Sequence, residues 1–138
     1  MKIDETTKFG ARVIERLHHE QVIWLTTVRS DGIPQPNPVW FLWDGEAFII
    51  YSQPHAKKVS HIKAHPKVSL NFDSNEGDDI AVFTGEAQID TSAPDVLKNA
   101  AYLRKYHQGI VSMGSTDEKM AESYSTVIRV TPSYMRGF

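Results

Sequence analysis

Hydrophobic and polar positions follow two different periods along this chain. Phe9, Val13 and Leu17 recur at every fourth position among charged residues, which predicts an amphipathic helix over residues 4–19. Residues 68–72 instead alternate one by one between apolar and polar side chains, a pattern typical of a half-buried strand. The two periods together predict a chain that mixes helices with strands.

Five further strands and three further helices are expected from apolar runs that turn residues separate. The strands fall at 22–28, 35–43, 47–51, 78–89 and 126–136, and the helices fall at 55–65, 94–106 and from 115 onward. Asp44-Gly45 between two apolar runs is the strongest hairpin signal. Six strands that meander early, with helices inserted late, predict a small antiparallel barrel of the α+β or mainly-β class.

Two local signals set the starts of the last two helices. Ser92-x-x-Asp95 and Ser115-x-x-Glu118 both resemble capping boxes, in which side chains bond to the free amides of a first helical turn. The first of these two helices is expected to end before Gly109. Gly85, inside the long strand at 78–89, predicts a bulge or bend.

Prolines alternate along the first half of the second strand. Pro34, Pro36 and Pro38 place their side chains on one face and their missing N–H groups on one edge of that strand. A strand with this pattern cannot sit between two partners, so it is expected at the edge of the sheet.

Composition narrows the class of protein. A length of 138 residues, with 41% hydrophobic and 23% charged residues, fits one globular domain over residues 1–138. A net charge of −2 gives no overall attraction to nucleic acid or to an anionic membrane, and the lack of cysteine excludes disulfides and thiolate chemistry. The polar start lacks the apolar core of a signal peptide and no apolar run approaches a membrane span, so a cytoplasmic protein is expected.

The helix at 55–65 begins with an unusual concentration of positive charge. Residues 55–67 hold four lysines and three histidines but no acidic residue, and Lys57 and Lys58 fall in the first turn. Cations are unfavourable there because the helix dipole is already positive, whereas the free amides of that turn bind anions. The order of residues therefore predicts a phosphate site, and a solvated basic face is the alternative.

The second strand offers an aromatic surface stiffened by proline. Trp40, Phe41 and Trp43 follow the prolines closely, and such a surface could lie against a planar ring in an apolar cleft. Burial in the core is the preferred interpretation for Phe41 and Trp43, and both interpretations stay open for Trp40. Polar groups for such a cleft are available from Asn37, Ser52 and Asn71.

Other chemistries find little support. His61 and His65 have the spacing of two metal ligands on one helix face, but no cysteine or carboxylate completes a set, so no metal site is expected. No nucleophile elbow, G-x-G-x-x-G or Walker loop is present. Hydrolase and dinucleotide-binding interpretations therefore lose their usual sequence evidence.

Several blocks of sequence together resemble a known group of proteins. The blocks are QVIWLTTV at 21–28, DGIPQPNPVWF at 31–41, YSQPHAKK at 51–58, the stretch 62–70, and FTGEA at 83–87. They resemble the pyridoxamine 5′-phosphate oxidase-like superfamily, and the chain is most similar to its single-domain deazaflavin (coenzyme F420)-dependent reductases. The resemblance implies a six-stranded split β-barrel, the FMN-binding split barrel, with about four flanking helices and with two cofactor sites at the interface of a homodimer.

The resemblance also implies where a cofactor lies. Residues 52–58 are expected to hold its phosphate, and the second strand to line its ring. No side chain is assigned as a catalytic acid or base, because hydride chemistry belongs to the ring. The residues of a pyridoxal-phosphate substrate site find no match here, so vitamin B6 oxidation is not expected. The residues expected at the cofactor are Asn37, Pro38, Val39, Trp40, Tyr51, Ser52, Gln53, His55, Lys57, Lys58, Asn71 and Arg136.

The resulting hypothesis is an F420-dependent oxidoreductase that transfers a hydride between reduced F420 and a conjugated organic acceptor. F420 carries an acidic tail beyond its phosphate, and a basic tract reaching from Lys57 to Lys67 is longer than one phosphate requires. An FMN-dependent enzyme on the same fold and a non-catalytic flavin or haem-type carrier are the alternatives.

Overall fold

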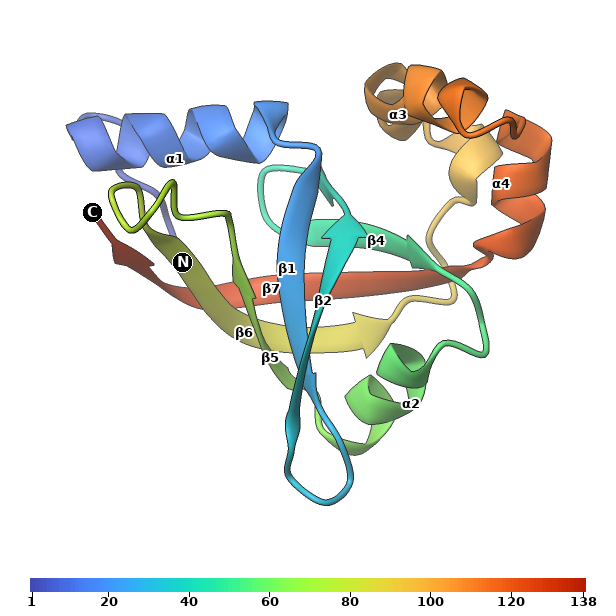
Figure 1. Ribbon diagram of the computed structural model, residues 1–138, viewed down its shortest axis with the longest axis horizontal. Helices are drawn as coiled ribbons and strands as arrows, with labels where there is room; N and C mark the ends of the chain where they lie inside the picture. Colours follow the sequence, from blue (N-terminus) through green and yellow to red (C-terminus); the bar gives the residue numbers. More distant parts are fainter.

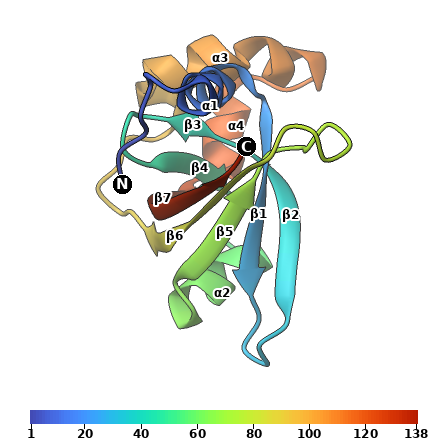
Figure 2. The same ribbon diagram turned by 90° about the vertical axis from the view of Figure 1, so that its left-hand side faces the viewer.

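The structure, a computed structural model, describes all residues 1–138 and contains a single antiparallel sheet of seven strands that curls into a split barrel (Figure 1). The strand order is β2-β1-β5-β6-β7-β4-β3, and Figure 2 shows β2, β1 and β5 side by side. The strands are β1 (Val22–Val28), β2 (Pro34–Trp40), β3 (Leu42–Trp43), β4 (Phe48–Ser52), β5 (Lys67–Asn71), β6 (Ala81–Ile89) and β7 (Thr126–Gly137). The helices are α1 (Lys8–His19), α2 (Lys57–Ala64), the 3-10 turn η1 (Val96–Lys98), α3 (Ala100–Ser112) and α4 (Asp117–Ser123).

The expected class is confirmed, but the expected number of strands is wrong by one. The predicted strand at 35–43 is interrupted at Phe41, so that β2 and β3 are separate. The backbone N–H of Phe41 donates to the Tyr106 hydroxyl at 2.9 Å, and its carbonyl accepts from Lys105 Nζ at 2.8 Å. Because side chains of α3 occupy these backbone groups, Phe41 cannot pair with a neighbouring strand.

Helices α1 and α2 lie at opposite ends of the barrel (Figure 1). The Thr7 hydroxyl accepts from the Gly10 amide at 2.9 Å, so α1 begins at Lys8 rather than at residue 4. Val13 and Leu17 of α1 join the barrel core, as the four-residue spacing predicted. Val59 and Ile62 of α2 enter the same core from the other end.

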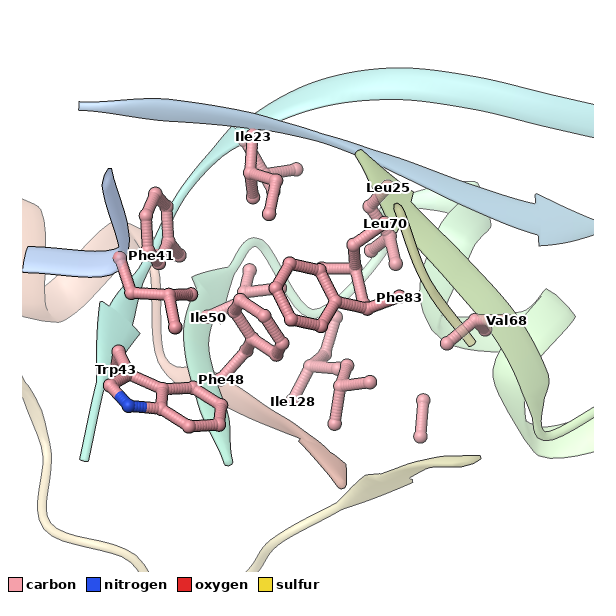
Figure 3. Close-up of a cluster of buried hydrophobic side chains, with 14 of the residues drawn as sticks. Ile23, Leu25, Phe41, Trp43, Phe48, Ile50, Val68, Leu70, Phe83 and Ile128 are labelled. Atoms are coloured by element: carbon pink, nitrogen blue, oxygen red, sulfur yellow. The ribbon is translucent and has the colours of Figure 1, made fainter. Parts of the chain in front are cut away.

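The barrel interior is filled by apolar side chains from several strands (Figure 3). Strand β4 is buried on both faces, which explains the apolar run from Phe48 to Tyr51. Phe48 and Ile50 point into the barrel, whereas Ile49 and Tyr51 belong to a second apolar cluster formed with α3 and α4. None of the helices combines the length and apolarity that a bilayer crossing requires.

The third predicted helix, 94–106, differs from the observed one at both ends. Asp95 caps the short turn η1 by accepting from the Lys98 amide at 3.1 Å, and Asn99 then caps α3 by accepting from the Tyr102 amide at 3.1 Å. Two caps in succession split the segment, so α3 starts late. It also continues through Gly109, where a Cβ would meet the Trp40 ring at 3.3 Å, so this glycine serves close packing rather than termination.

Three other expectations can be compared with the structure. The cap of α4 is Thr116, which accepts from the Lys119 amide, rather than Ser115. The bulge at Gly85 is confirmed, because the register of β6 against β7 shifts between Thr84 and Gly85. A Cβ on Gly85 would lie 2.2 Å from the Thr131 carbonyl oxygen, so only glycine lets β7 approach. The edge position of the proline-rich strand β2 is confirmed as well.

Candidate functional site

A cavity of about 290 Å³ lies where β2, β4 and the start of α2 meet α3 and α4. Its size is close to the lower end of small-molecule pockets, and its wall is largely apolar and aromatic, as is typical of such pockets. One ammonium group, that of Lys58, reaches this wall. The lining residues are Pro38, Val39, Trp40, Tyr51, Lys58, Tyr102, Met113, Met120 and Tyr124.

Trp40 is held in the cavity wall by α3. Its indole stacks on the Tyr106 ring with a centroid distance of 4.5 Å and an angle of 6° between the planes. Gly109 leaves room for the edge of the same indole. Phe41 and Trp43 instead belong to the barrel core, as the sequence analysis predicted. Trp40 is thus a fixed aromatic surface beside a cavity.

Three tyrosines, Tyr51, Tyr102 and Tyr106, stand close together at this wall, and their hydroxyls differ in hydrogen bonding. The Tyr51 hydroxyl donates to the Pro94 carbonyl oxygen at 2.8 Å and accepts from Asn99 Nδ2 at 3.0 Å. The Tyr106 hydroxyl accepts from the Phe41 amide and donates to the Gln21 carbonyl oxygen at 2.7 Å. Tyr102 is fully buried, and its hydroxyl has no partner. Burial raises the pKa of all three, so the hydroxyls stay protonated near neutral pH.

The start of α2 is open to an anion. Its cap, Ala56, offers no side-chain hydrogen bond, and the amides of Lys57 and Lys58 donate to no backbone carbonyl. The sequence placed Lys57 and Lys58 in the first turn, and the structure does the same. Burial lowers the pKa of the Lys58 ammonium, and no carboxylate offsets this effect. An anion in the cavity would be a natural partner for this charge.

Lys57 faces a different space. It lines a hollow of about 520 Å³ together with Arg29, Gln35 and His61. Arg29 forms an ion pair with Asp31, and His61 Nδ1 lies 3.0 Å from the buried Thr27 hydroxyl. The two neighbouring lysines therefore serve adjacent hollows rather than one shared point.

Four other residues expected at the cofactor do not line the cavity. Ser52 ends β4, and Gln53 and His55 lie on the connection from β4 to α2. Ser52 is buried, and its hydroxyl donates to the Gln53 carbonyl oxygen at 3.0 Å. Asn37 is exposed on the edge strand β2, opposite Leu25.

Asn71 and Arg136 lie on the outer face of the sheet. Cross-strand pairing puts both in one row that runs from β2 to β7. Within one chain the structure does not bring them to the cavity, although the sequence expected them at the cofactor. The row consists of Pro38, Trp24, Asn71, Val82 and Arg136.

Comparison with known proteins identifies the group to which this arrangement belongs. The family model described as Pyridoxamine 5′-phosphate oxidase matches residues 10–138. The chain belongs to the pyridoxamine 5′-phosphate oxidase family. Among curated proteins, none matches this member of the family in sequence.

Solved structures show how widely this fold of the pyridoxamine 5′-phosphate oxidase family is shared. An F420 reductase is 27% identical, with 88% of this chain and 94% of that chain covered and a TM-score of 0.66. A conserved hypothetical protein from Mycobacterium tuberculosis is 20% identical, with 93% and 82% covered and a TM-score of 0.72. HutZ, the heme storage protein from Vibrio cholerae, is 15% identical, with 99% and 95% covered and a TM-score of 0.63. At such identities the last two support the fold alone.

In this family member, sequence reasoning missed the part of the cavity wall that α3 and α4 supply. Tyr102, Tyr106 and Ile110 recur every four residues on the buried face of α3, and this spacing was the available signal. It predicts a buried helix face but not which strand the face covers. The missed lining residues are Tyr102, Met113, Met120 and Tyr124.

Proposed function

We propose that this chain is an oxidoreductase that binds a deazaflavin of the F420 type and transfers a hydride between reduced F420 and a conjugated organic acceptor. One observation carries the proposal: a single cavity joins a fixed aromatic wall at Trp40 to the Lys58 ammonium at an uncapped helix start. The apolar wall suits a planar ring, and the helix start suits a phosphate. The 27% identical F420 reductase adds support for the choice of cofactor.

The residues present fit such a group. Pro38, Val39 and Trp40 would line one side of the ring, and Lys58 with the free amides of the first turn would hold the phosphate. The uncompensated burial of Lys58 supports this, because an ammonium without a counter-charge gains most from an anion. When bound, a reduced deazaflavin supplies the hydride, and the chain's own residues orient the ring and exclude water.

The basic surface available to the acidic tail of F420 is smaller than the sequence suggested. Lys67 lies on β5 opposite Glu86, in a hollow on the outer face of the sheet, and is therefore not continuous with Lys57. Lys57, Arg29 and His61 share the hollow beside the start of α2. These three residues, rather than the whole tract from Lys57 to Lys67, would meet an anionic extension.

A homodimer forms part of the proposal. Trp24 and Tyr134 lie on the outer face of the sheet with 41% and 58% of their surface exposed, although both are large aromatic residues. A second copy on this face would cover them, as exposed aromatic patches commonly indicate. It would also give Asn71 and Arg136 a route to a cofactor bound by the other copy.

Cofactor titrations test the proposal. Quenching of the intrinsic fluorescence of Trp24, Trp40 and Trp43 should report binding, and F420 should bind more tightly than flavin mononucleotide. The advantage of F420 should shrink as salt is added, because its tail binds through screened charges. Tighter binding of flavin mononucleotide at every salt concentration would transfer the function to the FMN-dependent alternative. A haemin titration covers the carrier hypothesis, which ranks lower because no histidine lines the cavity.

A further inference from the structure

The Tyr102 hydroxyl is an anomaly among the tyrosines of α3 and β4. The Tyr51 hydroxyl has two partners and the Tyr106 hydroxyl three, whereas that of Tyr102 is buried with none. Tyr102 is 0% exposed, and it belongs both to the apolar cluster under α3 and to the wall of the cavity. A buried hydroxyl without a partner loses its hydrogen bonds to water and gains nothing in return.

Packing alone does not account for a tyrosine at this position. The ring makes an edge contact with Tyr51 at 4.7 Å and a tilted contact with Tyr106 at 4.8 Å between centroids. A phenylalanine would make the same ring contacts without the unpaired oxygen. Because Tyr102 also belongs to the cavity wall, a ligand bound in the cavity could supply the missing partner.

We propose that Tyr102 is a ligand-binding residue, whose hydroxyl donates a hydrogen bond to a carbonyl oxygen on the edge of the planar ring that the cavity holds. The inference rests on the proposed function for the identity of that ring. Flavins and deazaflavins share a pyrimidine edge with two carbonyl oxygens, so both cofactors present the required acceptor. Because burial raises the pKa of Tyr102, the hydroxyl keeps its proton and remains a donor. Lys58 and Tyr102 would then bind opposite ends of one ligand, the phosphate and the ring.

Tyr102→Phe tests this with two measurements that move in opposite directions. The midpoint of unfolding of the apo protein should stay the same or rise, because the substitution removes an unpaired buried oxygen. The affinity for F420, for flavin mononucleotide and for riboflavin should fall by about tenfold, since each ring loses the same donor. Riboflavin lacks the phosphate, so its loss of affinity reports the ring contact by itself.

Tyr51→Phe and Tyr106→Phe are the matched controls. Both remove a hydroxyl that already has protein partners, so both should lower the unfolding midpoint of the apo protein. If the wild-type protein and Tyr102→Phe bind flavins equally well, the inference is overturned and the proposed function stays intact. Lower apo stability in Tyr102→Phe would also overturn it, by showing a protein partner. Wild-type protein that binds none of the three ligands would overturn both proposals.

Discussion

Replacing Lys58 by methionine should make the apo protein more stable and should weaken its affinity for the cofactor. Lys58 stands in the first turn of α2, where the helix dipole is already positive, and burial lowers the pKa of its ammonium. No carboxylate near it compensates for either effect. Methionine keeps the apolar stem that lines the cavity and removes only the charge.

The magnitudes follow from this geometry. A cation in a first turn costs about 0.3–1 kcal/mol, and the Lys58 side chain is only partly buried, so solvent screens part of its burial penalty. The free energy of unfolding should therefore rise by about 1 kcal/mol at most. A charge-assisted contact to phosphate contributes about 1.5–3 kcal/mol, so the affinity for flavin mononucleotide or F420 should fall roughly tenfold or more. Riboflavin should bind with unchanged affinity, because it has no phosphate.

Urea unfolding of the apo protein and fluorescence titrations of the three ligands measure these effects. Lys63→Met is the matched control, since Lys63 is an exposed lysine on the same helix and lines neither hollow. Equal losses of affinity in Lys58→Met and Lys63→Met would show that only a diffuse basic face attracts the ligand. Lower apo stability of Lys58→Met with unchanged affinity would refute the phosphate assignment altogether.

Three further predictions concern the rest of the fold. Burial lowers the pKa of Lys105 to about 8, below its ordinary value of 10.5, so the unfolded chain binds more protons between these values and stability should rise from pH 8 to pH 10. Lys105→Met should flatten that rise, whereas tyrosines act only above pH 10 because their pKa values are raised. Gly85→Ala should destabilise the protein by about 1–3 kcal/mol in urea unfolding, because its Cβ meets the Thr131 carbonyl oxygen, and Thr84→Ala should not. Light scattering at micromolar concentration should give the mass of a dimer, and a monomer would contradict the proposed outer-face interface.

Local features of the fold were readable from the sequence because neighbouring residues decide them. The spacing of Val13 and Leu17 placed α1 on the core, and the apolar run at 47–51 marked the doubly buried β4. Gly85 predicted the bulge, since a strand interior keeps glycine where another backbone approaches. The first turn of α2 with its two lysines was also visible, because the order of residues along a helix fixes which ones meet its dipole.

The part of the cavity wall that α3 and α4 supply was not readable, because it joins residues far apart in the chain. Trp40 stacks on Tyr106, and no local pattern around either residue names the other. The predicted end of the third helix failed for the same reason: Gly109 looked like a stop, but its small size serves the contact with Trp40. Lys57 and Lys58 were expected to act together, yet adjacent positions on a helix point about 100° apart, which sends them into different hollows.

The interruption at Phe41 connects the two edges of the sheet at the place where the cavity forms. Strands β2 and β3 are the two edges of the sheet, so the chain passes from one edge to the other through this single residue. Its backbone groups, which neither edge can satisfy there, bond to Tyr106 and Lys105 of α3. The same contact holds α3 against Trp40, which turns the helix face carrying Tyr102 towards the gap between β2 and β4. Helix α3 therefore both satisfies the backbone where the chain passes between the two edges of the sheet and supplies part of the wall against which a planar cofactor would lie.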